Sequence, residues 1–306
     1  MRAIWNHLGG FGKLLMTIML VVTSFFGVTL LAILAALPFT DGLFPVGTEG
    51  MPLSVNMLRY FQIVQSFSVF IIPSLLAGLF FWGHLTRGIG FRRPATGLLL
   101  MSLAIIVSSQ PLVSYLGILN SNMQLPEFLK GLELWMKQSE DSATDIIYSF
   151  LDTNQPGLLL INFIMIAILP ALGEEMLFRG VLQPVFREWL KNKHVAVWLT
   201  AFLFSAIHLQ FFTFLPRFFL GLALGYLMLL GKNLWYPVAG HFANNFISLI
   251  IFYYYRYTNP DINPLRPGTE DLTTDWTFVL PSIALLGFLL WKFYKIRSAQ
   301  EQTKNY

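Results

Sequence analysis

The sequence predicts an all-α, polytopic membrane protein, a bundle of about eight transmembrane helices with both termini in the cytoplasm. Its 306 residues are 55% hydrophobic, and their mean hydropathy is +0.61. Only 12% are charged, whereas soluble domains carry about 25% charged residues. Apolar runs long enough to cross the hydrocarbon core of a bilayer recur along the chain. This composition excludes a soluble globular protein.

Eight apolar segments give the expected number of helices. The first is longer than the hydrophobic core of a cleavable signal peptide, so we expect it to be retained as a span. The fifth and sixth are short and separated by only a few residues. The eight segments lie at 14–39, 60–83, 96–119, 157–182, 194–212, 215–231, 235–255 and 276–291.

The basic residues predict the orientation. Cytoplasmic loops of membrane proteins carry an excess of Lys and Arg. With the N-terminus inside, the only acids in the inner segments are Glu188 and Glu301. The basic residues there are Arg2, Lys13, Arg87, Arg92, Arg93, Arg187, Lys191, Lys193, Lys232, Lys292, Lys295, Arg297 and Lys304. We therefore expect an integral multi-pass protein of the plasma (inner) membrane, and the net charge of +4 does not indicate a nucleic-acid partner.

The long connection at 120–156 has helical character. Phe128, Leu132 and Trp135 alternate with Lys130 and Glu133 in a partly amphipathic pattern. This pattern predicts a helix that lies on the outer leaflet or caps the bundle. The chain then divides into three parts: 1–156 with the first three spans and this connection, 157–256 as the core, and 257–306 with the last loop, span and tail.

Two interruptions of apolar helices are expected to serve packing. Gly221 and Gly225 form a GxxxG pattern, which lets two helices approach closely. The sequence SSQP at 108–111 places a proline inside the third span, where it is expected to kink the helix.

One stretch, LGEEMLFRGVLQ at 172–183, places charges inside an apolar segment. Each such charge costs about 2.5–3.5 kcal/mol on insertion scales, so intramembrane ionisable residues are functional candidates. On a helix Glu175 and Arg179 are four residues apart and can pair, whereas Glu174 points about 100° away. One carboxylate is therefore expected to be paired and the other left over.

Two further polar clusters occur in apolar segments, FSAIH at 204–208 and HFANN at 241–245. Glu174 lies about 17 residues before the cytoplasmic turn at 191–193 and His208 about 17 after it, which predicts equal depth on antiparallel helices. His241 lies about nine residues beyond Lys232, with Asn245 one turn further on the same face. The spans are thus expected to bring Glu, His, His and Asn to one region.

This set of residues suits peptide hydrolysis by water. A desolvated carboxylate can act as a general base, and a neighbouring imidazole can share the proton. A second His with an Asn can stabilise an oxyanion. Zinc bound by Glu174, His208 and His241 is the alternative. The sequence has no HExxH spacing and Asn is a poor zinc ligand, so we expect no metal or other cofactor. With no cysteine, thiolate sites and a Cys nucleophile are excluded.

The three motifs, Glu-Glu-x-x-x-Arg, Phe-x-x-x-His and His-x-x-x-Asn, resemble those of the CPBP (ABI) family of intramembrane proteases. That family includes CAAX prenyl endopeptidases and bacteriocin-processing or immunity proteins. The resemblance covers about 157–255. It implies that Glu174 activates water with His208 and that His241 and Asn245 form the oxyanion site. Glu175 would complete the catalytic set by orienting the site together with Arg179, and Phe204 would be a further orienting residue. The substrate would be a membrane-anchored or prenylated protein or peptide.

Two other functions stay open at this stage. A non-catalytic immunity or scaffold protein would keep the bundle for a partner and would not need all three polar clusters. A proton-coupled transporter could use the same Glu, His and Arg as a relay. Such transporters are commonly built from inverted repeats, and the sequence shows no convincing one.

Overall fold

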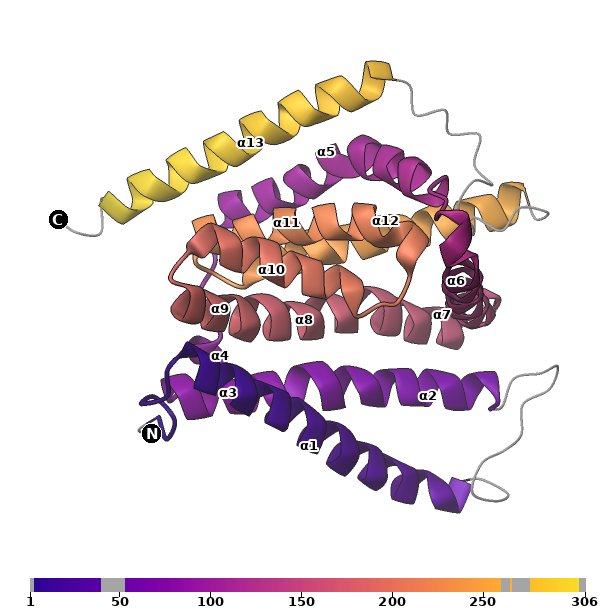
Figure 1. Cartoon of the computed structure of the whole chain (residues 1–306), viewed down its shortest axis with the longest axis horizontal. Coiled ribbons are helices and arrows are strands. Elements are labelled where there is room, and N and C mark those ends of the chain that lie inside the picture. Colours follow the sequence, from indigo (N-terminus) through magenta and orange to yellow (C-terminus); the bar gives the residue numbers. More distant parts are fainter. Residues whose placement is uncertain (1–2, 40–52, 260–264, 266–275, 303–306) are drawn as a thin grey trace. The chain divides into compact units, whose positions relative to one another are not determined.

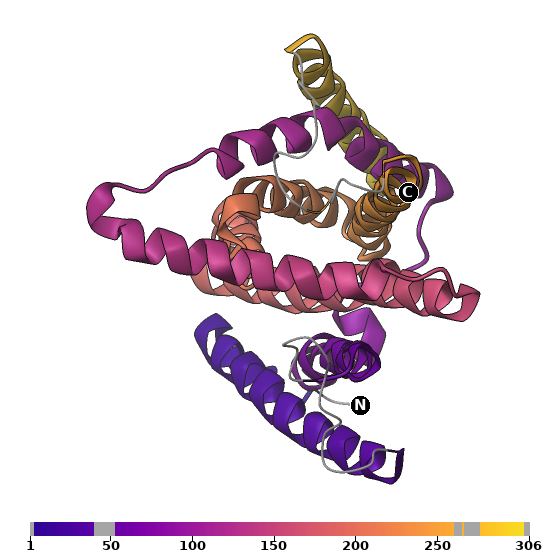
Figure 2. The same cartoon turned by 90° about the vertical axis from the view of Figure 1, so that its right-hand side faces the viewer.

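A computed structural model describes residues 3–39, 53–259, 265 and 276–302. Helices account for nearly all of these residues, and the described part of the chain contains no strand. The chain forms two compact units, each made of two segments: Met1–Phe91 with Ser149–Asn192, and Arg92–Tyr148 with Lys193–Tyr306. We call them unit 1 and unit 2. Figures 1 and 2 show their helices in two views. The predicted fold class, a polytopic helical membrane protein, is confirmed.

Unit 1 is built from three long helical rods. The first is α1 (Gly10–Ala36). The second runs through α2 (Val55–Gln65), the π-helical segment η2 (Ser66–Ile71) and α3 (Ile72–Trp82), with the short α4 (Leu85–Gly88) after it. The third runs through α7 (Pro156–Phe163), η4 (Ile164–Ile168), α8 (Leu169–Glu175), η5 (Met176–Leu182) and α9 (Gln183–Leu190).

Prolines explain the three π-helical segments of unit 1. The segments η2, η4 and η5 are each followed, two residues after their last residue, by a proline: Pro73, Pro170 and Pro184. Proline has no N–H, and its ring clashes with the carbonyl four residues earlier. Widening the preceding turn to i→i+5 hydrogen bonds relieves the clash without ending the helix. Such π-bulges are frequent at functional sites, and η5 begins directly after Glu175.

Close backbone contacts and buried polar bonds hold the rods of unit 1 together. A Cβ on Gly10 would lie 2.4 Å from the backbone nitrogen of Trp189, so α1 meets α9 at a position that only glycine fits. Beside it, Lys13 forms an ion pair of 2.7 Å with Glu188. In the second rod, buried Arg59 donates to the carbonyl of Phe150 at 2.7 Å.

Unit 2 contains α5 (Thr96–Ser121), α6 (Lys130–Leu151, of which 130–148 belong to this unit), α10 (Lys193–Ala206), α11 (Phe214–Gly231), α12 (Trp235–Thr258) and α13 (Trp276–Gln302). Its core gathers on α5, which packs against α11, α12 and α13. Fully buried members include Ile105, Ile106, Leu224, Leu227 and Phe293.

The predicted spans correspond to helices of the structure, but fewer than eight have the length and composition of a span. Six do, among the described residues: Gly10–Ala36, Val55–Trp82, Thr96–Ser121, Pro156–Leu190, Phe211–Gly231 and Thr277–Gln300. Helix α10 has only 14 residues. Helix α12 is long, but His241, Asn244 and Asn245 lower its mean hydropathy. The number eight and the orientation stay predictions.

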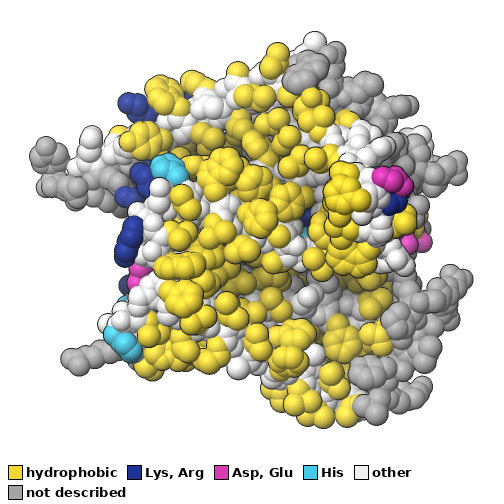
Figure 3. All heavy atoms as spheres, in the orientation of Figure 1, with side chains coloured by type: hydrophobic (Ala, Val, Ile, Leu, Met, Phe, Trp, Pro, Cys, Tyr) yellow, Lys and Arg dark blue, Asp and Glu magenta, His cyan; other side chains and the backbone are white. Residues whose placement is uncertain are grey.

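The exposed side chains of the outer helices fit contact with lipid. Phe26 and Leu31 on α1 are each 67% exposed, and Phe278 on α13 is 65% exposed. Figure 3 shows hydrophobic side chains over most of the described surface seen in that view. A surface of this kind is unfavourable in water and favourable in a bilayer.

The helix predicted in the connection at 120–156 is present as α6. Several of its polar residues, among them Asp141 and Asp145, are exposed. The side chains of Glu133, Glu140 and Thr144 are buried, whereas Phe128, in the turn before the helix, and Trp135 are exposed. Two of its four acids, Glu133 and Glu140, therefore face the protein, whereas Asp141 and Asp145 face outward together with Trp135.

Candidate active site

In unit 1, the Glu-Glu-x-x-x-Arg motif lies across the junction of α8 and η5. Arg179 Nη1 donates to Glu175 Oε1 at 2.7 Å, and both side chains are fully buried. The pairing predicted from the four-residue spacing is thus present, although the helix is π-helical from Met176 onward.

Glu174 is the more accessible carboxylate of the motif. It is 9% exposed, whereas Glu175 and Arg179 are each 0% exposed. Arg179 interacts electrostatically with both acids but forms its ion pair with Glu175. The preceding Gly173 lets α8 approach η2, since a Cβ there would lie 3.1 Å from Phe70 and 3.2 Å from Ile71. This close packing fixes the backbone that carries Glu174.

In unit 2, Phe204 packs against both histidines of the motifs. Its ring centroid lies 5.4 Å from that of His208 and 5.7 Å from that of His241, each in an edge-to-face arrangement. Phe204 is buried, and α11 approaches it closely because Gly221 has no side chain. The two histidines, which are 33 residues apart in sequence, therefore share one aromatic support.

His208 lies just beyond the end of α10, which finishes at Ala206. The sequence predicted a helical segment through 212, but Leu209 has a φ of +53°, which reverses the chain there. His208 Nδ1 lies 2.8 Å from the carbonyl oxygen of Phe204. Because a carbonyl can only accept, Nδ1 carries the hydrogen in the neutral ring, and Nε2 presents its lone pair.

The connection after His208 is held by two buried polar side chains. Glu140 of α6 accepts from Phe212 N–H at 2.7 Å and from Thr213 Oγ1 at 2.9 Å. Asn120, at the end of α5, donates to the carbonyl of Phe211 and accepts from Leu215 N–H. The sequence analysis did not identify either residue, because the neighbouring sequence does not show which distant backbone groups they bind.

A chain of side-chain amides reaches Asn245. Gln110 Nε2 donates to Asn244 Oδ1 at 3.3 Å, and Asn244 Nδ2 donates to Asn245 Oδ1 at 3.4 Å. Asn245 Oδ1 is thus engaged as an acceptor, and the NH₂ group is the donor end of the same side chain. Gln110 belongs to the SSQP interruption, for which the sequence favoured a packed kink over residues that line a cavity.

The predicted site residues divide between the two units. Glu174, Glu175 and Arg179 belong to unit 1. The other predicted residues, Phe204, His208, His241 and Asn245, belong to unit 2. The meeting of Glu174 with His208 stays a prediction.

Taken together, the helices and the polar groups buried in them define a polytopic membrane protein with ionisable motifs in its apolar segments. Residues 156–247 match the family model described as type II CAAX prenyl endopeptidase Rce1-like. This segment contains all three motifs and belongs to that family, which confirms the CPBP membership predicted from them. The family indicates a peptidase that works in the membrane. No curated protein and no solved structure matches the chain.

Proposed function

We propose that the protein is an intramembrane endopeptidase that hydrolyses peptide bonds of membrane-associated, CAAX-like substrates in the plasma membrane. Glu174 activates the water, His208 is its partner, and His241 with Asn245 stabilises the oxyanion. The observation that carries this proposal is the bond between His208 Nδ1 and the Phe204 carbonyl, because it leaves Nε2 as a base. The family match supports the peptidase class.

The proposed reaction uses Glu174 as a carboxylate and His208 as a neutral imidazole with its hydrogen on Nδ1. Glu174 takes a proton from water while the oxygen attacks the scissile carbonyl carbon. The negative charge that develops on the carbonyl oxygen is met by the NH₂ group of Asn245 and by His241. The tetrahedral intermediate collapses when the C–N bond breaks and the amine takes the proton, through His208 Nε2. The hydroxyl group of the water thus becomes part of the new carboxyl group, and its proton goes to the new amine.

Glu175 has a different task from Glu174. It forms an ion pair with Arg179, and both side chains are fully buried. Its negative charge therefore balances the positive charge of the buried guanidinium. We propose that this pair orients the helix junction that presents Glu174. The division of labour follows the difference in exposure between the two acids.

Zinc is the mechanistic alternative. Glu174, His208 Nε2 and His241 are chemically suitable ligands, and a histidine that donates its other N–H to a carbonyl is a common arrangement at metal sites. A bound zinc ion would polarise the carbonyl and lower the pKa of a bound water. We propose the metal-free reaction because the fourth motif residue, Asn245, is a poor zinc ligand but a suitable oxyanion donor.

The test uses purified protein in detergent and a library of membrane-anchored and prenylated peptides, with mass spectrometry as the readout. We expect cleavage by the wild type that survives a chelator and is lost in Glu174→Gln. The control is Glu127→Gln, which removes an exposed acid of the outer connection and should retain full activity.

Each other result points to a different function. Cleavage that a chelator abolishes and zinc restores would replace the metal-free mechanism by a zinc mechanism. A folded wild type that cleaves nothing in a broad library would contradict the peptidase proposal and favour the immunity or scaffold function. Proton-coupled uptake into vesicles that is lost in Glu174→Gln would indicate a transporter.

A further inference from the structure

Glu140 is a buried acid that the proposed reaction does not use. It lies on α6, in the part of that helix that belongs to unit 2, and it is 6% exposed. The ion pairs among the described side chains do not include it. Burying a carboxylate without a counter-charge is costly unless hydrogen bonds compensate the lost hydration. The hydrogen bonds of Glu140 therefore indicate what it is for.

Both carboxylate oxygens of Glu140 bind one short turn. Oε2 accepts from Phe212 N–H at 2.7 Å, and Oε1 accepts from Thr213 Oγ1 at 2.9 Å. The turn is the 3-10 helix η6 (Phe211–Thr213), directly before α11, and the residues that precede these two helices do not cap them with their side chains. The first N–H groups of a helix lack intrahelical partners, and a negative charge is favourable there. Glu140 thus supplies the cap that the local sequence lacks.

Further contacts fix the same turn. The ring centroid of Trp135 on α6 lies 5.5 Å from that of Phe211, and Lys137 Nζ lies 5.6 Å from the ring centroid of Phe212. From the end of α5, Asn120 donates to the carbonyl of Phe211. Side chains of two other helices therefore determine where η6 lies.

His208 lies in the connection 207–210, which joins the end of α10 to η6. On the α10 side, its ring Nδ1 lies 2.8 Å from the carbonyl oxygen of Phe204. The next residue, Leu209, has a φ of +53°. Residues other than glycine rarely adopt this conformation, and it persists where the surrounding structure holds it. By capping η6, Glu140 fixes the far end of the connection that carries His208.

From this geometry we propose that Glu140 is a positioning residue for His208. It holds the connection 207–210 so that His208 Nε2 keeps its place for proton transfer. The inference rests on the proposed function of His208 and extends it to the connection 120–156, to which α6 belongs. A displacement of a catalytic group by about 1 Å can lower the rate by about a hundredfold. A helix outside the three sequence motifs would then contribute to catalysis.

The alternative is that Glu140 only stabilises unit 2 as a whole. Diethyl pyrocarbonate, which acylates neutral imidazoles, separates the two functions when mass spectrometry reads each histidine of the full chain in detergent. A local displacement changes the labelling of His208 alone, whereas a general loss of stability also exposes His241, which is 4% exposed. The exposed His194 of α10 is the reference for the reagent.

Glu140→Ala should raise the labelling rate of His208 relative to His194 and leave that of His241 unchanged. We expect kcat, per folded protein, to fall by about tenfold to a hundredfold at an unchanged KM, because substrate binding does not depend on the place of His208. Glu140→Gln keeps an oxygen that can accept from Phe212 N–H. It should therefore restore most of the wild-type labelling and activity.

Two further variants complete the series. Thr213→Val has nearly the same shape and removes one of the two bonds to Glu140, so it should change labelling and kcat in the same direction but less. It also tests the inference if Glu140→Ala does not fold. Asp141→Asn, which changes the neighbouring exposed acid of α6, is the matched control and should behave like the wild type.

The labelling and the kinetics test different proposals. Labelling of His208 that stays at the wild-type rate in Glu140→Ala and Thr213→Val overturns the positioning inference, and so does labelling of His208 and His241 that rises together. Displacement of His208 with an unchanged kcat also overturns it. If a folded wild type cleaves nothing in a broad library, the endopeptidase proposal fails, whereas the labelling still decides whether Glu140 positions His208.

Discussion

At the residue scale, burial separates two adjacent carboxylates that look identical in the sequence. Glu175 is enclosed with Arg179, whereas Glu174 keeps some exposure. A buried pair of this kind adds little net stability over apolar residues of the same size, but breaking it leaves a charge buried without its partner. The proposed function accordingly assigns Glu175 to the fold and Glu174 to the reaction.

This difference predicts opposite effects of two isosteric substitutions. Glu175→Gln should destabilise the protein by about 3–5 kcal/mol, because the Arg179 charge loses its ion-pair partner. Glu174→Gln should change stability by less than about 1 kcal/mol and abolish cleavage. Denaturant or thermal unfolding in detergent, with circular dichroism as the probe, measures the first effect. The double variant Glu175→Gln, Arg179→Met should be less destabilised than Glu175→Gln alone; equal or greater destabilisation would contradict the argument.

Whether a contact between side chains could be predicted depended on how far apart the two residues lie in the sequence. The contact between Glu175 and Arg179 follows from spacing on one helix, and it is present. The amide chain from Gln110 to Asn245 and the contact between Glu140 and the 211–213 turn join segments more than 70 residues apart. Their existence depends on which helices pack together, and a single sequence does not contain that information.

At the element scale, helix type and polarity were the features that sequence periodicity described least well. The apolar runs located the helices, but the π-helical turns arise from prolines placed inside long rods. Helix α10 ends before His208 because the chain reverses at Leu209. In α6, an amphipathic pattern predicted a helix but not that Glu133 and Glu140 would face inward. The π-helical turns have a local cause, the prolines, whereas the end of α10 and the inward acids of α6 depend on tertiary contacts.

The inward acid Glu133 of α6 predicts a pH dependence. It accepts from Lys137 at 2.7 Å, from Leu125 N–H at 3.1 Å and from Lys130 at 3.3 Å. These bonds, that from Lys137 most of all, outweigh desolvation and lower the pKa of Glu133 from 4.5 to about 2. A lowered pKa means that the unfolded state binds the proton more tightly. The stabilisation is therefore complete above pH 4.5 and is lost as the pH falls towards 2.

The start of α6 should accordingly loosen in acid before the rest of unit 2 does. Trp135 lies two residues from Glu133, so its fluorescence or the hydrogen exchange of 125–137 reports the change. Glu133→Gln should remove the pH dependence of this segment and leave it as labile at pH 7 as the wild type is near pH 2. An acid transition that persists unchanged in Glu133→Gln would show that other groups cause it.

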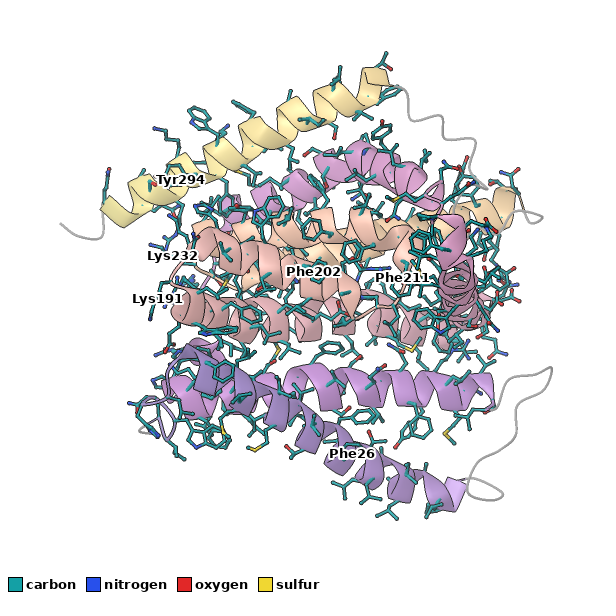
Figure 4. The ribbon with its side chains drawn as sticks, in the orientation of Figure 1. Phe26, Lys191, Phe202, Phe211, Lys232 and Tyr294 are labelled. Carbon is teal, nitrogen blue, oxygen red and sulfur yellow. The ribbon has the colours of Figure 1, made fainter. Side chains whose placement is uncertain are left out.

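At the scale of the whole molecule, unit 2 gathers the predicted inner segments at one end. Asn233 Nδ2 donates to the carbonyl of Arg92, and Tyr236 OH accepts from Ala95 N–H, which joins the start of α5 to the turn after α11. Tyr236 also packs against Phe293 of α13. Figure 4 shows Lys232 and Tyr294 at one end of this unit and Phe211 at the other. The basic residues predicted that these segments lie on one side of the membrane, and their position at one end of unit 2 agrees with that. The orientation in the membrane stays a prediction.

The orientation can be tested with single cysteines, because the natural chain has none. Arg93 precedes α5 and Ser142 lies on α6, both are exposed, and one candidate span, Thr96–Ser121, separates them. Since basic segments stay in the cytoplasm, Ser142→Cys should react with an impermeant maleimide on intact cells. Arg93→Cys should react only after permeabilisation. The reverse pattern would invert the topology, and labelling of both from one side would show that α5 does not cross the bilayer.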